Sequence, residues 1–172
     1  VKKEAHSSNA SFAGKIAIDS SSSKNAAQEI PAGSALVVPL SGAAFTKEKE
    51  DAMMKEIRAW MGTPYKFGIV EKGKGTDCSG FVGYVFQKVL NISLPRQSSE
   101  MYSSGESVGR SELKCGDLIF FQNTYKGAKG ASHVGMYLGE EKFAHASTTV
   151  GVTISDLSED YYAKHFLGCR RV

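Results

Sequence analysis

Two stretches of the chain repeat their apolar residues at helical spacing. The first covers residues 46–62, carries acidic residues in its first turn and ends at Gly62, as is usual for a helix in a globular protein. Its apolar positions are Met53, Ile57, Trp60 and Met61. The second follows Cys78 and has apolar positions at Phe81, Val82, Val85, Phe86, Val89 and Leu90. The spacing predicts two helices that cover a hydrophobic core.

The last third of the chain contains short apolar segments that are typical of β-strands. They are "DLIFF" (117–121), "HVGMYLG" (133–139), "KFAHAS" (142–147) and "FLGCRRV" (166–172). Short connections between such segments indicate an antiparallel sheet. Because the helices come first and the strands later, the order predicts an α+β domain and not alternating βαβ units.

The N-terminal part of the chain has a different composition. Residues 1–28 are rich in Ser, Ala, Asn and Lys and have no sustained periodicity, so they bury too little apolar surface to offset the entropy of ordering. Residues 30–45 are more apolar, but two prolines and a glycine interrupt them. We therefore predict a tether or linker over 1–45, partly disordered or packed on the surface, and one domain over 46–172.

Composition narrows the class of protein only a little. With 172 residues, 41% hydrophobic and 23% charged, the chain resembles an ordinary globular protein. The net charge of +3 suits an anionic partner such as a cell-wall polymer. No block of Lys and Arg is interleaved with aromatic residues, so no nucleic-acid partner is expected. No apolar run reaches the length of a membrane span. The chain begins at Val1, which we interpret as a processed or trimmed product, so a missing export signal says little about location.

The segment "GTDCSGFVGYVF" (75–86) places Cys78 where a polar turn meets the second predicted helix. If Asp77 caps that helix, backbone N–H groups and the helix dipole face the sulfur and favour the thiolate. A thiolate nucleophile still needs a base. His133 and His145 lie in consecutive predicted strands across the turn "GEEK". The hairpin can present both on one side, as an imidazole base and the polar group that orients it.

Seven motifs occur in an order and at spacings that resemble the NlpC-type family of cell-wall cysteine peptidases. They are "GTPYKFG", "TDCSGFV", "SLPRQS", "CGDLIFF", "SHVGMYLG", "FAHAS" and the terminal "RRV". The similarity covers about Thr46 to Val172 and is greatest to the Spr-like murein endopeptidases. It implies a papain-like fold in which the nucleophile lies at the start of a helix packed on an antiparallel sheet.

The resemblance also implies roles for individual residues. Cys78 is the expected nucleophile, His133 the general base and acid, and His145 the group that orients His133. The backbone N–H of Cys78 is the natural donor to an oxyanion. At the positions that face substrate in the family, Tyr65 is expected to border the site and to help stabilise the oxyanion. Asp77 and Ser79 are expected to shape the pocket.

By the same resemblance, the substrate is the peptide stem of peptidoglycan, cut next to a D-amino acid through an acyl-enzyme. The bond can lie within a stem or in a cross-link between stems. No metal or organic cofactor is implied. The expected location is the periplasm, the cell surface or the secreted fraction, and a lipid anchor lost with the N-terminus is the only expected link to a membrane. A monomer is expected.

Several alternatives remain open from the sequence. The same scaffold supports an amidase or an acyltransferase. A catalytically silent cell-wall-binding module is an alternative from a different class of protein. Cys78, His133 and His145 are also the residue types of a zinc site. Cys115 and Cys169 stand where the family usually has a proline and a small residue. They either form a disulfide or remain two separate buried thiols.

Overall fold

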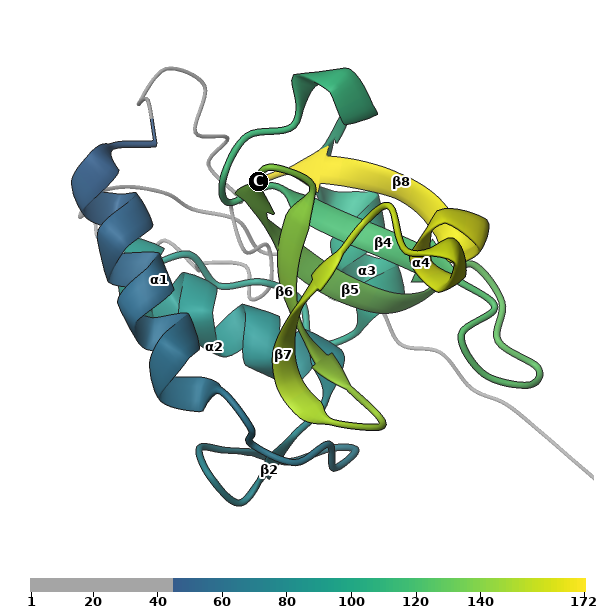
Figure 1. Cartoon of the computed structure of the whole chain (residues 1–172), viewed down its shortest axis with the longest axis horizontal. Coiled ribbons are helices and arrows are strands. Elements are labelled where there is room, and N and C mark those ends of the chain that lie inside the picture. The colour runs from purple at the N-terminus through teal and green to yellow at the C-terminus, as the bar shows by residue number, and fades with distance from the viewer. Residues whose placement is uncertain (1–44) are drawn as a thin grey trace, which may run out of the picture. The chain divides into compact units, whose positions relative to one another are not determined.

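The computed structural model describes residues 45–172, which form helices packed against an antiparallel sheet (Figure 1). The tether predicted over 1–45 lies, apart from Phe45, outside the described residues. The helices are α1 (Lys47–Trp60), α2 (Cys78–Leu90), α3 (Ser98–Ser104), the short 3-10 helix η1 (Arg110–Glu112) and α4 (Asp160–His165). The strands are β1 (Val70–Glu71), β2 (Gly75–Thr76), β3 (Glu106–Val108), β4 (Leu118–Gln122), β5 (Ala131–Gly139), β6 (Lys142–Ser147), β7 (Gly151–Asp156) and β8 (Phe166–Arg171).

Six of the strands form one antiparallel sheet in the order β3-β8-β4-β5-β6-β7, and β1 pairs with β2 in a separate small hairpin. The α+β class predicted from the order of helices and strands is confirmed. The four predicted strands and both predicted helices are present, although β5 begins at Ala131, two residues before the predicted start. The sequence interpretation missed α3, α4, β3, β7 and the β1–β2 hairpin.

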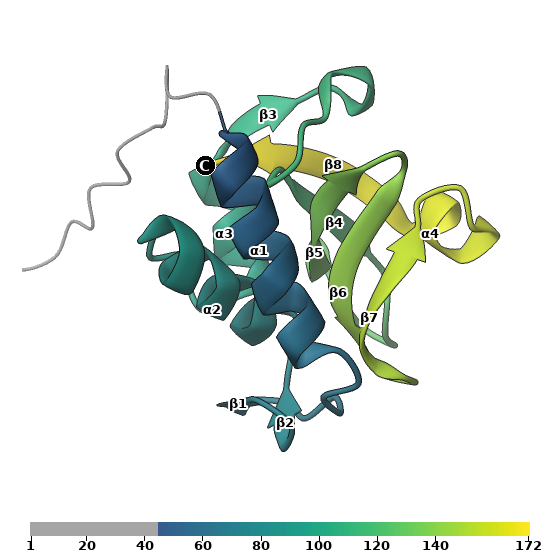
Figure 2. The ribbon, with the colours of Figure 1, turned by 60° about the vertical axis from the view of Figure 1, so that its left-hand side comes forward.

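The helices α1, α2 and α3 lie on one side of the sheet (Figure 2). Trp60 of α1 packs against Phe81 of α2, with ring centroids 5.8 Å apart, and both side chains are almost fully buried. Val134 and Met136 of β5 belong to the same core as these two rings. Burial of these apolar faces is what holds the helix that carries Cys78 against β5. None of the helices within 45–172 has the length and apolarity that a membrane crossing needs.

A second, smaller core covers the opposite face of the sheet. Phe121 of β4 and Phe143 of β6 pack with ring centroids 5.2 Å apart. Tyr162 of α4 closes over them, 4.9 Å from the Phe143 ring. Because both faces of the central strands are covered, side chains on β5 and β6 are held in fixed positions.

The edge strand β7 is anchored to the chain that follows α1. The N–H of Val152 donates to the carbonyl of Thr63 at 2.9 Å, and the N–H of Gly62 donates to the carbonyl of Val152 at 2.9 Å. Gly151 has φ +78, and a Cβ there would lie 2.3 Å from the Thr63 carbonyl oxygen. Only glycine fits this close approach. The register of β7, and with it the position of Ser155, is therefore fixed.

Candidate active site

Cys78 is the first residue of α2, at the helix N-terminus that the sequence predicted. The side chain of Asp77 accepts a hydrogen bond from the N–H of Gly80 at 2.8 Å and so caps the helix. The Cys78 side chain is 6% exposed and faces the core next to Val134. The backbone N–H groups of Cys78, Ser79 and Val134 each lower the pKa of the thiol. The capped helix start thus aims the thiol at β5.

The ionisation state predicted for Cys78 from the sequence is wrong. The expectation was a thiolate held by helix N–H groups, and those groups do lower the pKa of the thiol. Burial acts in the opposite direction with a larger effect, and the neighbouring Asp77 carboxylate adds to it, so the net shift of the Cys78 pKa is upward. In the resting protein Cys78 is therefore a thiol, and it would need a base to act as a nucleophile.

The two imidazoles predicted to work together are in direct contact. Nε2 of His133 lies 2.9 Å from Nδ1 of His145, with the rings nearly perpendicular. His145 is 1% exposed, whereas His133 is partly exposed. Burial lowers the pKa of His133 to about 4 and, together with His133, lowers the pKa of His145 to about 3. Both rings are therefore neutral near pH 7, as a general base must be.

His133 and Cys78 lie on two elements that pack against each other, β5 and α2. Val134, whose N–H lowers the pKa of the Cys78 thiol, directly follows His133 in the chain. Since Nε2 of His133 is bonded to His145, its Nδ1 is the nitrogen left to receive a proton from the thiol. The structure thus pairs the two predicted histidines directly and places His133 next in the chain to the residue whose N–H acts on the Cys78 sulfur.

Tyr65 borders the same site. It forms an isolated parallel bridge with Thr76, two residues before the nucleophile, and is half-buried against the core. Burial, with a further contribution from the nearby Cys78, raises the pKa of Tyr65 to about 12. The Tyr65 hydroxyl therefore keeps its proton and is available as a hydrogen-bond donor.

Arg96 is a site residue that sequence reasoning missed. Its guanidinium binds both carboxylate oxygens of Asp77, at 2.9 and 2.5 Å, and donates to the Ser79 hydroxyl at 3.0 Å. The N–H of Gly68 also donates to Asp77, at 2.7 Å. Burial alone would raise the pKa of Asp77, but these hydrogen bonds lower it. The only sequence signal for Arg96 was a cation inside the motif "SLPRQS", which does not identify its partner.

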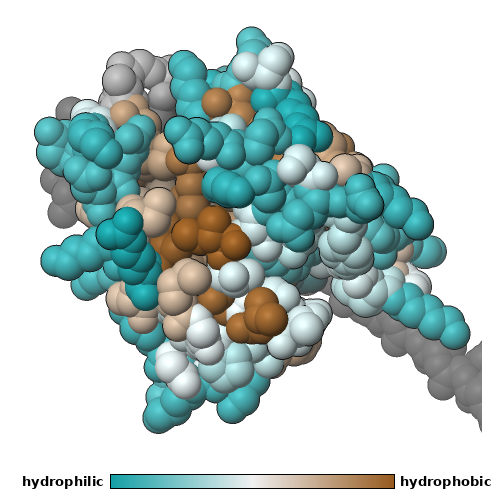
Figure 3. Space-filling view, in the orientation of Figure 1, coloured by the Kyte–Doolittle hydropathy of each residue, from teal (hydrophilic) through white to brown (hydrophobic). Residues whose placement is uncertain are grey.

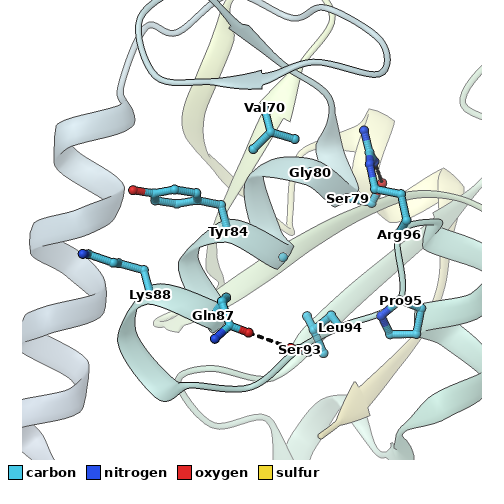
Figure 4. Close-up of a pocket in the computed structure, with 11 residues that line it drawn as sticks. Val70, Ser79, Gly80, Tyr84, Gln87, Lys88, Ser93, Leu94, Pro95 and Arg96 are labelled. Carbon is cyan, nitrogen blue, oxygen red and sulfur yellow. Dashed lines mark hydrogen bonds between the residues drawn. The ribbon is translucent and has the colours of Figure 1, made fainter. Parts of the chain in front are cut away.

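Arg96 and Ser79 also form one end of an open groove of about 560 Å³ along the outer side of α2 (Figure 4). Gly80 and Gly83 of α2 also line the groove, and a Cβ at Gly80 would lie 2.6 Å from the Val70 side chain. The other lining residues are Val70, Tyr84, Gln87, Lys88, Ser93, Leu94 and Pro95. Ser79, which lines this end of the groove, directly follows Cys78 in the chain. The groove contains cationic but no acidic side chains.

The face seen in Figure 3 is polar over α1, whereas hydrophobic residues gather between α1 and the β6–β7 hairpin. Several large apolar side chains in the described chain are exposed, and four of them occur in the segment between α1 and β2. They are Met61, Phe67, Ile69 and Val70, and Phe67 is 87% exposed. Gly68, in the middle of this segment, is the residue that donates to Asp77. An apolar rim therefore borders the polar site.

The zinc alternative and the cysteine pair can both be compared with the structure. Within residues 45–172, no three His, Cys, Asp or Glu side chains converge as metal ligands. The three cysteines are free thiols. Cys169 is buried in β8, opposite Ile119, while Cys115 is half-buried near Glu50 of α1. Of the two arrangements left open for Cys115 and Cys169, the structure has separate thiols.

The buried histidines predict a loss of stability at mildly acidic pH. Their folded pKa values of about 4 and about 3 lie below the ordinary value of 6.5. Between pH 6.5 and about 4 the unfolded chain therefore binds more protons, and the free energy of unfolding decreases as the pH falls through this window. We expect a loss of roughly 2–4 kcal/mol for the pair. Urea unfolding at pH 7 and pH 4.5 measures it.

A His145→Gln variant provides the control for this measurement. It should lose a large part of the pH dependence, whereas Asp77 should contribute little in this window because its pKa is below 3.8. Equal stability of the wild-type protein at the two pH values would contradict the burial of neutral imidazoles.

A cysteine at a helix start, a histidine on an adjoining strand and a second polar group behind it define the class of papain-like cysteine hydrolases. The chain belongs to the NlpC/P60 family, whose model matches residues 62–171. Among solved structures, one from Staphylococcus aureus, described as similar to lipoprotein, NLP/P60 family, has a TM-score of 0.69 and 36% identity, covering 77% of this chain and 44% of that one. The family and the papain-like fold predicted from the motifs are confirmed.

Curated relatives match the same region. The Gamma-DL-glutamyl hydrolase of Bacillus subtilis is 44% identical over 119 residues, which is 69% of this chain and 28% of that protein. The Murein DD-endopeptidase MepS/Murein LD-carboxypeptidase of Escherichia coli K12 is 42% identical over 120 residues, which is 70% of this chain and 61% of that protein. The similarity thus spans less than two thirds of the length of these relatives.

Proposed function

We propose that this chain is a cysteine endopeptidase that hydrolyses amide bonds in the peptide stems or cross-links of peptidoglycan, next to a D-amino acid. The observation that carries the proposal is the contact of His133 with His145 at 2.9 Å, on the strand whose Val134 N–H acts on the Cys78 sulfur. The names of two relatives, a γ-DL-glutamyl hydrolase and a murein DD-endopeptidase, support the substrate class. The enzyme would act where that polymer lies, outside the cytoplasmic membrane.

The first half of the reaction forms the acyl-enzyme. Nδ1 of His133 takes the proton of the Cys78 thiol as the sulfur attacks the scissile carbonyl carbon. The carbonyl oxygen becomes an oxyanion that the N–H of Cys78 and the hydroxyl of Tyr65 stabilise. The protonated imidazole then donates its proton to the departing amine, the C–N bond breaks and a thioester remains. His145 holds the His133 ring in place throughout.

The second half hydrolyses the thioester. A water molecule loses a proton to Nδ1 of His133 while its oxygen attacks the thioester carbonyl. The tetrahedral intermediate expels the Cys78 sulfur, which regains the proton from His133. The products are a carboxylic acid and the original thiol with a neutral imidazole. Every proton is carried by side chains of the site.

Substrate binding is proposed to involve Tyr65, Asp77 and Ser79 in different ways. Ser79 lines the groove and Tyr65 is half-buried, while the carboxylate of Asp77 is fully engaged inside the protein. Asp77 therefore shapes the pocket by fixing Arg96, whose side chain remains 49% exposed. This half-exposed cation at the end of the groove is suited to a carboxylate on the peptide stem.

The test is mass spectrometry of purified muropeptides incubated with the protein. We expect new fragments whose masses assign the bond that is cut. Treatment with iodoacetamide, which alkylates thiols, should abolish the fragments, whereas a chelator should leave them unchanged. Addition of a free amine separates hydrolysis from acyl transfer, because a transferase would give an amide product. Absence of any cleavage of peptidoglycan peptides would refute the proposal.

A further inference from the structure

The outer nitrogen of His145 lies against two hydroxyl groups from different elements. Nε2 of His145 is 3.0 Å from the hydroxyl of Ser155 on β7 and 3.2 Å from that of Tyr162 on α4. The two hydroxyls also bond each other, since Ser155 donates to Tyr162 at 3.3 Å. His145 is 1% exposed. The His145 ring is thus held between His133 on one side and the hydroxyls of Ser155 and Tyr162 on the other. The proposed mechanism assigns no role to these two hydroxyls.

The contact between the two histidines contains one hydrogen, and its position decides which nitrogen of His133 is basic. If Nε2 of His133 carries the hydrogen, it donates to Nδ1 of His145, and Nδ1 of His133 has a free lone pair. If Nδ1 of His145 carries the hydrogen instead, a neutral His133 must hold its own hydrogen on Nδ1. In that second arrangement His133 cannot accept the proton of Cys78.

The hydrogen of Ser155 indicates which arrangement the protein adopts. A serine hydroxyl has a single hydrogen, and here it is given to Tyr162. The Ser155 oxygen, the nearer of the two hydroxyls at 3.0 Å, then presents lone pairs to Nε2 of His145, so its favourable partner is an Nε2–H group. Tyr162 keeps one hydrogen of its own, and in this arrangement that hydrogen points away from Nε2, which the Tyr162 oxygen faces at 3.2 Å. A neutral His145 with its hydrogen on Nε2 has an unprotonated Nδ1, which accepts from His133.

We propose that Ser155 and Tyr162 are positioning residues that fix the tautomer of His145 and thereby keep Nδ1 of His133 unprotonated. The two hydroxyls work as a unit, because Tyr162 accepts the Ser155 hydrogen and Ser155 accepts the hydrogen on Nε2. The proposal rests on the proposed function only for the statement that His133 is the base. The direction of the hydrogen bonds can be observed without any substrate.

Two single variants remove the hydroxyls and leave the packing in place. Tyr162→Phe retains the ring, which packs 4.9 Å from Phe143 and 5.4 Å from Phe121. Ser155→Ala removes one oxygen from a strand whose register other contacts hold. Tyr161→Phe is a matched control, because Tyr161 precedes Tyr162 in α4 and is 50% exposed.

The primary measurement is nitrogen-15 NMR of His145 in the free protein at neutral pH. We expect its hydrogen on Nε2 in the wild type and in Tyr161→Phe, and a substantial fraction on Nδ1 in the double variant Ser155→Ala/Tyr162→Phe. On muropeptides, kcat should fall about tenfold in each single variant and little further in the double variant, because the two hydroxyls work as a unit, with KM changed less than about twofold. The control should keep wild-type kcat.

Two results would overturn the proposal. One is a wild-type His145 whose hydrogen lies on Nδ1, and the other is a Tyr162→Phe variant with both the tautomer and kcat of the wild type. Should the double variant not fold, the wild-type spectrum and the Tyr162→Phe variant decide the question. If the protein does not cleave muropeptides at all, the proposed function fails, yet the NMR result still supports or refutes this assignment.

Discussion

Replacing Cys78 with alanine should reduce muropeptide cleavage by at least about 10⁴-fold, because the proposed acyl-enzyme forms on the Cys78 sulfur. The substitution removes one sulfur atom from a nearly buried position and leaves Asp77 as the helix cap. The folded structure should therefore persist. The measurement is the initial rate of product formation by mass spectrometry, together with a thermal unfolding curve for each variant.

The other two cysteines offer matched controls for this experiment. Cys115→Ala and Cys169→Ala remove the same atom from positions near α1 and in β8, where neither thiol belongs to the site. Both variants should cleave within about twofold of the wild-type rate when they are folded. A Cys78→Ala protein that digests peptidoglycan as fast as the wild type would rule out the thiol mechanism and favour a binding module with a contaminating hydrolase.

Replacing Asp77 with alanine should lower the free energy of unfolding by about 2–4 kcal/mol, the largest stability effect expected at the site. The carboxylate is almost fully buried and accepts hydrogen bonds from the N–H groups of Gly68 and Gly80 and from Arg96. Without it, the start of α2 loses its cap and two N–H groups lose their partner. Arg96 is half-exposed, so its charge can return to water, and this limits the cost.

Urea unfolding of Asp77→Ala measures the effect, and Lys74→Ala is a contrasting control. Lys74 and Glu71 form an ion pair with the same 2.5 Å separation, but their side chains are 73% and 56% exposed. Loss of that exposed pair should change stability by less than about 0.5 kcal/mol. If both variants lost equal stability, burial would not be the reason for the importance of Asp77. Cleavage should also fall in Asp77→Ala, because the frayed helix start no longer aims Cys78.

The groups proposed to react could be predicted from the sequence because local signals mark them. Cys78 stands between a capping aspartate and an apolar helical run, and both features act within a few residues. His133 and His145 lie in two strands joined by a tight turn, so their proximity follows from hairpin geometry. Their contact at 2.9 Å agrees with that expectation.

The residues that support these groups could not be predicted in the same way. Arg96 reaches Asp77 across 19 positions of the chain, and Tyr162 reaches His145 across 17. Such contacts depend on how α3, α4 and β7 pack, and those elements are too short for a clear periodic signal. Ser155 is on β7, which the strand pattern missed.

The ionisation of Cys78 was predicted wrongly for a related reason. The sequence reveals the helix N-terminus, which favours a thiolate, but it does not reveal the degree of burial, which favours the thiol. The balance depends on how closely β5 covers the sulfur. Only the folded structure shows how deeply the Cys78 sulfur is buried.

The proposed nucleophile and its proposed base belong to different layers, α2 and β5, which pack against each other. Neither the helical layer nor the sheet contains both reacting groups, so a chain that has not completed its folding holds an ordinary, exposed cysteine and no hydrolytic centre. Latency before folding is thus inherent in the architecture. The onset of cleavage during refolding should coincide with the docking of α2 on the sheet.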